Sequence, residues 1–134
     1  MKGSYILLIK LNENKKIKVV KLSKLFFKKG FYVYIGSAMN NLEKRISRHL
    51  RKNKKFHWHI DYLLQKADIL EVYIKENTIK EECKIANIFE EKLKKIDGFG
   101  CSDCKCASHL FYGKKVDILD LILKIDMIKA YYTF

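Results

Sequence analysis

The chain has 134 residues, a length that suits one domain with its own hydrophobic core. Its 28 Lys and Arg against 15 Asp and Glu give a net charge of +13, which predicts a polyanionic partner, nucleic acid before membrane; the alternative is a lysine-rich surface that only aids solubility. The sequence lacks an apolar run of transmembrane length and a signal peptide, and its four Cys do not resemble a secreted disulfide framework, so we expect a cytoplasmic protein.

The first part of the chain has the composition of β-strands. Residues 4–9 and 17–22 are rich in Ile, Leu and Val, and the turn residues 12–14 between them predict a β-hairpin. A turn at 28–30 leads into a third strand, 31–35, which is aromatic and β-branched. Three strands before the first helix favour an antiparallel sheet.

A tight turn and a basic helix are predicted to follow the third strand. Gly36-Ser37-Ala38 has the composition of the turn, because Gly36 removes the Cβ that a sharp exit would not tolerate. Asn40 as N-cap and Glu43 three residues later form a capping box, so we expect the helix to begin at about Asn41. The buried stripe of this helix would consist of Leu42, Ile46 and Leu50.

Cations are concentrated on this helix and its exit, which predicts contacts to nucleic-acid phosphates. The residues we expect to bind nucleic acid in this way are Lys44, Arg48, Arg51, Lys52, Lys54 and Lys55.

The second half of the chain predicts helices and strands in alternation. We expect a short helix from Ile60, a strand at 69–74 and a long helix at 79–96, which Thr78 would cap and which would end at Gly98. The last expected elements are a strand at 108–112, a helix at 116–125 and a strand at 127–134. The predicted fold is therefore α+β, a single domain over 1–134 with a small, mostly antiparallel sheet flanked by helices.

Three separated segments carry a motif: Gly3-Ser4-Tyr5, then Tyr34-Ile35-Gly36, then Leu42-x-x-Arg45 with His49. Together they resemble the signature of the GIY-YIG nuclease superfamily. Nearly end to end, the chain is similar to a GIY-YIG-like family of unknown function found in archaea and bacteria, sometimes fused to an endonuclease III-type DNA glycosylase. The closer resemblance lies in Lys2-Gly3-x-Tyr5, Gly30-x-Tyr32-Val33-Tyr34-Ile35-Gly36-Ser37-Ala38, Arg48-His49-Leu50-Arg51, His57-Trp58-His59-Ile60-Asp61-Tyr62-Leu63, Glu82-Cys83, Gly98-Phe99-Gly100-Cys101-Ser102-Asp103-Cys104-x-Cys106 and Ser108-His109-Leu110.

The resemblance implies catalytic roles for Tyr5, Tyr34, Arg45 and Glu82, with Glu82 holding one divalent metal, Mg²⁺ or Mn²⁺. This chemistry is consistent with the residue types. The arginine fork fits phosphate oxygens, a carboxylate suits Mg²⁺, and a tyrosine becomes a base near neutral pH only if a cation such as Arg45 lowers its pKa. His49 would be either a structural histidine or a further group that transfers protons or binds phosphate.

Two polar clusters lie outside the motif. His57, His59 and Asp61 form the first, and with Asp103 and His109 they would surround one cleft if the fold brings them together. The second cluster offers four ligands of the types that bind zinc, but they fall within nine residues, whereas structural zinc usually joins two distant pairs. We therefore expect no tightly bound zinc at the second cluster, Cys101, Cys104, Cys106 and His109.

The resemblance thus implies a metal-dependent endonuclease that hydrolyses phosphodiester bonds, with DNA as the expected substrate, a repair or restriction-like role and a functional link to a DNA glycosylase. A nucleic-acid-binding module that has lost catalysis is the alternative, since binding needs only the Lys and Arg residues. Hydrolysis or transfer on another phosphorylated substrate is a third hypothesis.

Overall fold

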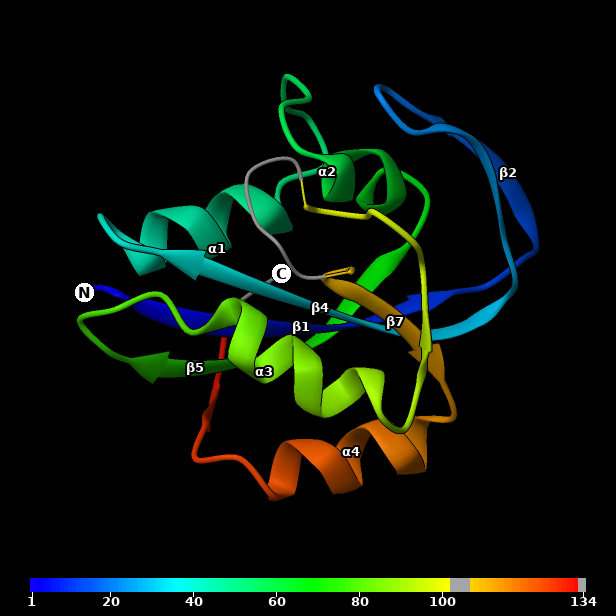
Figure 1. The fold of residues 1–134 in the computed structure, drawn as a ribbon. Helices are drawn as coiled ribbons and strands as arrows, with labels where there is room; N and C mark the ends of the chain where they lie inside the picture. The colour runs from blue at the N-terminus through cyan, green and yellow to red at the C-terminus, as the bar shows by residue number, and fades with distance from the viewer. Residues whose placement is uncertain (102–106, 133–134) are drawn as a thin grey trace.

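The computed structural model describes residues 1–101 and 107–132, and within these residues it has one six-stranded antiparallel sheet, one two-stranded ribbon and four helices (Figure 1). The six strands of the sheet follow the order β6-β7-β4-β1-β5-β8. The elements are β1 (Gly3–Leu11), β2 (Lys15–Val19), β3 (Ser23–Phe27), β4 (Gly30–Ala38), α1 (Leu42–Leu50), α2 (His59–Leu64), β5 (Asp68–Glu76), α3 (Glu82–Glu90), β6 (Lys94–Lys95), β7 (Leu110–Gly113), α4 (Lys115–Leu123) and β8 (Ile128–Ala130).

Strand β1 is the centre of the sheet, because β4 and β5 pair with its two edges. Both of its faces are covered, so its sequence is nearly all apolar instead of alternating with polar residues. Ile6 and Leu8 belong to the core under α3 and α4, whereas Leu7 and Ile9 belong to the core under α1 and α2. The two helix pairs therefore lie on opposite faces of one sheet (Figure 1).

The predicted α+β class with a mainly antiparallel sheet is confirmed. Two predicted helices, from Ile60 and over 116–125, and two predicted strands, 69–74 and 108–112, are also confirmed, with bounds that differ by a few residues. The last strand is shorter than predicted, and its final two residues, 133–134, lie outside the described part of the chain. No helix among the described residues is long and apolar enough to cross a membrane.

The predicted hairpin between 4–9 and 17–22 is wrong. β2 pairs with β3, a strand that the sequence reading missed, and the two form a separate ribbon, while β1 pairs with β4 and β5. The cause is that a true hairpin turn lies at residues 20–22, where Lys21 adopts a positive φ of 72° and Leu22 N donates to Val19 O. Four strands therefore precede α1 instead of three.

The predicted turn at Gly36-Ser37-Ala38 is also wrong, because these residues continue β4 and pair with β1 as far as Ala38 opposite Gly3. The chain turns only at 39–40. As a consequence the N-cap of α1 is Asn41, one residue later than predicted, and its side chain accepts a hydrogen bond from Lys44 N at 3.0 Å.

Helix α3 is much shorter than the predicted helix 79–96. Its N-cap is Glu81, and Ile79, which was expected to be buried, is 66% exposed. After α3 the chain reverses and β6 pairs with β7, so Leu93 and Ile96 reach the core from a turn and a strand end and not from a helical stripe. Gly98 has a positive φ of 71°, but it does so in the turn after β6 and does not cap α3.

Candidate active site

A cleft of about 390 Å³ opens where β1, β4 and α1 meet the starts of α2 and α3. Four of the predicted catalytic residues line it together: Tyr5 from β1, Tyr34 from β4, Arg45 from α1 and Glu82 from α3. Residues that are separated by as many as 77 positions in the sequence thus converge on one cavity. The fifth, His49, lies directly behind Tyr5.

Both tyrosine motifs contain a glycine at a position where a side chain would collide with a neighbouring strand. Tyr5 is paired with Gly36 across the two strands, and a Cβ on Gly36 would lie 2.2 Å from Tyr5 Cζ. A Cβ on Gly3 would lie 2.2 Å from Lys75 O of β5. The aromatic ring of Tyr5 therefore crosses the neighbouring strand only because the residue opposite has no side chain.

Burial controls the protonation of both tyrosines. It raises the pKa of Tyr5 to about 12, although the charge of Arg45 opposes the shift, and it raises the pKa of Tyr34 well above the ordinary value. The sequence reading expected Arg45 to lower a tyrosine pKa, but removal of the phenol from water has the larger effect. Both phenols are neutral at pH 7, and each is able to donate a hydrogen bond.

His49 is only 2% exposed, and its Nε2 lies 2.7 Å from the Tyr5 hydroxyl. Burial lowers the pKa of His49 to about 3, with a further contribution from Lys54, so the imidazole is neutral. Its Nδ1 is buried without a hydrogen-bond partner among the described residues. His49 is therefore placed to orient the Tyr5 hydroxyl and does not reach the cleft itself.

Arg45 is held in place by contacts on two sides. Its Nη1 donates to Ser37 O at 3.1 Å, and its guanidinium lies 4.3 Å from the ring centre of Trp58. Arg48 also lies against that ring, at 4.5 Å. Stacking on an aromatic face stabilises a guanidinium and still leaves N–H groups for a phosphate.

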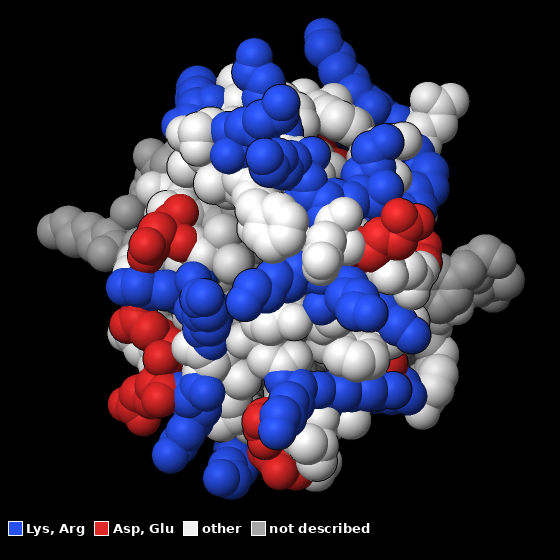
Figure 2. Space-filling view, turned by 90° about the vertical axis from the view of Figure 1, so that its right-hand side faces the viewer, with Lys and Arg blue, Asp and Glu red and all other residues white. Residues whose placement is uncertain are grey.

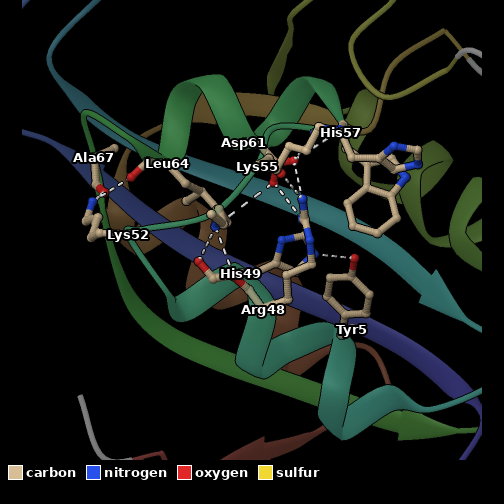
Figure 3. A network of polar contacts seen from close by, with 11 residues as sticks. Tyr5, Arg48, His49, Lys52, Lys55, His57, Asp61, Leu64 and Ala67 are labelled. Carbon is tan, nitrogen blue, oxygen red and sulfur yellow. Dashed lines mark hydrogen bonds and ion pairs between the residues drawn. The ribbon is translucent and has the colours of Figure 1, made fainter.

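Asp61 organises the loop that carries Trp58. The side chain is fully buried, and it accepts two hydrogen bonds from Arg48, at 2.9 Å each, and two more from His57 N and Trp58 N, at 2.7 and 2.9 Å (Figure 3). Burial raises the pKa of Asp61, but the Arg48 and backbone donors lower it more, so the carboxylate is charged. Asp61 is thus a structural anchor of the site rather than a group that lines the cleft.

This network occupies three of the basic residues that were expected to contact phosphates, and it corrects the predicted roles of two of them. The Lys54 side chain is 3% exposed and donates to Arg48 O and His49 O at the end of α1, and Lys52 donates to Leu64 O and Ala67 O (Figure 3). Arg48 is committed to Asp61 and Lys55 O. Arg48 and Lys54 therefore hold α1 against α2 and do not form the expected phosphate-binding surface. Lys44, Arg51 and Lys55 are exposed, as a phosphate contact requires.

Glu82 has the features of a metal ligand. Its Oε2 is buried, and no described group donates a hydrogen bond to it. The other glutamates considered for this role are placed differently: Glu81 accepts from Lys75, and Glu90 and Glu91 are exposed at the far end of α3. A lone carboxylate with waters and a substrate phosphate is a usual Mg²⁺ site, so the residues present fit a divalent ion.

The structure brings together three of the five residues that were expected around a second, histidine-rich cleft. His57, His59 and His109 line the same cavity as Glu82, and His59 Nδ1 accepts a hydrogen bond from Gly100 N at 2.9 Å. His109 Nε2 lies 3.7 Å from Cys83 Sγ. Asp103 lies outside the described residues.

The zinc hypothesis concerns residues that the structure covers only in part. Cys104 and Cys106 lie outside the described range, and Cys101 lies at its edge. Within residues 1–101 and 107–132, no group of three or more His, Cys, Asp or Glu side chains is arranged to hold a metal ion.

Sequence reasoning missed four contributors to the cleft. Trp58 lies in one of the segments that carry the resemblance, and a single Trp between two His at the start of a helix is a usable signal for a role at the site. Val20 and Lys21, from the turn of the β2–β3 ribbon, and Lys80 also line the cavity. No periodicity links those residues to the tyrosine motifs, so the sequence offered no signal for them.

Fold and site together define a small α+β domain with a cationic, tyrosine-lined cleft. The chain matches a protein family described as a domain of unknown function, DUF123, over residues 4–129, and it belongs to that family. No curated protein and no solved structure matches the chain.

Proposed function

We propose that the protein is a metal-dependent endonuclease of the GIY-YIG type that hydrolyses phosphodiester bonds in nucleic acid, with DNA as the substrate. The observation that carries this proposal is the convergence of Tyr5, Tyr34, Arg45 and Glu82 on one cleft. A domain that only binds phosphates would need the cations but not the tyrosines or the buried carboxylate. The net charge of +13 supports a polyanionic substrate.

Each residue has a role that its geometry allows. Arg45, fixed by Trp58 and Ser37 O, would hold the phosphate and neutralise the charge that develops on its oxygens. The neutral phenols of Tyr5 and Tyr34 would donate hydrogen bonds that orient the attacking water or the phosphate, and His49 would fix the Tyr5 hydroxyl. Glu82 would hold Mg²⁺ or Mn²⁺, which supplies Lewis-acid charge when bound.

A non-catalytic nucleic-acid-binding module is the second candidate, and one observation favours it. Burial raises the pKa values of Tyr5 and Tyr34 and lowers that of His49, so none of these three groups is a ready base for water at pH 7. Binding requires no such base.

Single-turnover cleavage assays on plasmid, flap, loop and single-stranded substrates, with Mg²⁺ or Mn²⁺, distinguish the two candidates. We expect wild type to cleave and Arg45→Ala, Tyr34→Phe and Glu82→Gln each to lower the rate far more than the affinity, on the order of 10²–10³-fold for loss of a preorganised charge-stabilising group. Glu91→Gln, an exposed glutamate at the other end of α3, is the matched control and should cleave like wild type.

Metal binding is measured separately from turnover. Mn²⁺ should raise the melting temperature of wild type and of Glu91→Gln but not of Glu82→Gln, because a ligand that binds only the folded state stabilises it. A pure wild-type sample that leaves every substrate intact with both metals would favour the binding module.

A further inference from the structure

The ribbon of β2 and β3 carries a dense charge that nothing in the described structure neutralises. Residues 15–29 contain seven Lys and no Asp or Glu. None of the ion pairs found among the described residues includes one of these lysines. More than half of the net charge of +13 therefore lies on a stretch of fifteen residues.

The pairing register sorts this ribbon into two faces. Lys16 is opposite Phe26 and Lys18 is opposite Lys24, so these four side chains share one face, and all four are exposed, Phe26 by 54%. Like charges directly opposite each other destabilise a strand pair, and more than half of the Phe26 side chain stays in contact with water. Neither feature serves the stability of the ribbon, whereas both suit a polyanion with flat, apolar rings.

The opposite face of the ribbon fixes it to the body of the protein. Ile17, Val19 and Phe27 are buried in the core under α1 and α2, and Phe27 meets Phe99 edge to face with ring centres 6.2 Å apart. The inner face of the ribbon is thus packed against the core, which holds the outer face in a fixed position relative to the rest of the protein. It occupies one side of the molecule in Figure 1, and Figure 2 shows Lys and Arg side chains spread over that side.

The turn of the ribbon reaches the cleft. Val20 and Lys21 line the same cavity as Arg45 and Glu82. The proximity has an electrostatic effect, since burial lowers the pKa of His59 and the charge of Lys21 adds to that shift. A strand of nucleic acid held at Arg45 would therefore meet the ribbon next.

We propose that the outer face of the β2–β3 ribbon binds a single-stranded flank of the nucleic acid whose phosphate lies in the cleft, with Lys16, Lys18 and Lys24 on phosphates and Phe26 stacked on an unpaired base. Exposed aromatic rings among cations are the usual platform for single strands, because every unpaired base offers a flat face, whereas in a duplex these faces are already stacked. The inference rests on the proposed function and adds that the substrate has a single-stranded segment beside the phosphate in the cleft.

The contribution of the lysines is tested by measuring the affinity for a labelled thymidine oligonucleotide of roughly 12 nucleotides by fluorescence anisotropy. The measurement is made at several salt concentrations, with a chelator present to remove divalent metal. Lys18→Gln/Lys24→Gln should reduce the slope of log K against log salt by about 1.4, at roughly 0.7 per phosphate contact. Lys92→Gln/Lys124→Gln removes the same charge from exposed positions after α3 and α4 and should keep the wild-type slope.

Phe26→Ala tests the stacking and should weaken single-strand binding roughly 5- to 150-fold. Its affinity for a blunt duplex should stay close to that of wild type. The melting temperature of each variant verifies that it is folded, which the exposure of these side chains leads us to expect.

The chelator separates this test from the test of catalysis, because binding is measured without turnover. Loss of single-strand affinity in the ribbon variants but not in the control supports the proposal even if cleavage is never seen. Equal losses of affinity in the control pair would mean that only net charge matters, which would overturn the proposed binding mode. A Phe26→Ala variant that binds single strands like wild type, or whose affinity for duplex falls as much as its affinity for single strands, would overturn it as well. In either case the cleavage assays would still decide the endonuclease proposal.

Discussion

His49 and the tyrosines that it approaches are neutral for one physical reason, which is their removal from water. The imidazole of His49 is 2% exposed, its Nε2 lies 2.7 Å from the Tyr5 hydroxyl, and the charges of Lys54 and Arg45 add to the lowering of its pKa by burial. A charged imidazole there would lose hydration and meet positive neighbours. Protonation of His49 is therefore coupled to unfolding.

This coupling predicts how stability depends on pH. The pKa of His49 is about 3 in the folded state and about 6.5 when unfolded, so below pH 6.5 the unfolded state binds one more proton, and stability falls as the pH falls toward 3. The free energy of unfolding, measured by urea titration, should decrease by about 2 kcal/mol between pH 7.5 and pH 5 through this group. His49→Gln should lose that part of the decrease, and the exposed His57→Gln variant should retain it; equal pH profiles for wild type and His49→Gln would contradict the assignment.

At the scale of elements, a network of polar side chains joins α1 to α2. Arg48 of α1 and Asp61 of α2 form a two-bond ion pair, and Lys54, in the connection between the helices, donates to the last carbonyls of α1. The same carboxylate orients the backbone before α2 and thereby Trp58, on which Arg45 stacks. Arg45 is thus positioned by a chain of contacts that starts at Asp61.

We therefore expect Asp61→Asn to be strongly destabilising. Removing one partner of a buried ion pair leaves the other charge without compensation and typically costs about 3–5 kcal/mol. Urea unfolding measures this loss, and Asp68→Asn is the matched control, because Asp68 is 62% exposed and its contact with Lys52 is 3.9 Å long. The control should change stability by no more than roughly 1 kcal/mol. An Asp61→Asn variant as stable as the control would mean that the helices are joined by apolar packing alone.

At the scale of the whole molecule, two cores share one sheet. The strands β1 and β4 contribute alternate residues to both, such as Leu7 and Tyr34 to one core and Ile6 and Val33 to the other. Neither core can lose its strands without exposing the other, because the side chains of both are attached to the same backbone. We infer that the two faces unfold together as one cooperative unit.

That inference is tested by following unfolding with two probes. Trp58 is the only tryptophan and packs against the core under α1 and α2, whereas far-ultraviolet circular dichroism reports all helices and strands. Both signals should give the same urea midpoint and the same slope, as two-state unfolding requires. A Trp58 transition at lower urea than the circular dichroism transition would show that the cleft face is a separate unit, and would contradict the prediction of a single domain.

The sequence determined the elements whose signal is local. Apolar and β-branched runs located β1, β4, β5 and β7, and helical periodicity located α1 and α4, because these patterns depend on neighbours along the chain. It failed where pairing or termination depends on distant segments. β1 pairs with β4 and not with the next strand, and α3 ends at Glu90 since the following residues turn back to pair with β7.

For the site, the motif residues Tyr5, Tyr34, Arg45 and Glu82 could be named from the sequence, since the resemblance depends on residue types at separated positions. Only the tertiary structure decided which of their neighbours are accessible. In the sequence Arg48 and Lys54 look like their exposed neighbours Lys44, Arg51 and Lys55, but the fold packs them against Asp61, and it brings the turn of the lysine ribbon to the cleft. The sequence alone tells which residues are cationic. Whether such a residue is hydrated or forms an ion pair depends on the distant segments that pack against it, and those are decided by the tertiary structure.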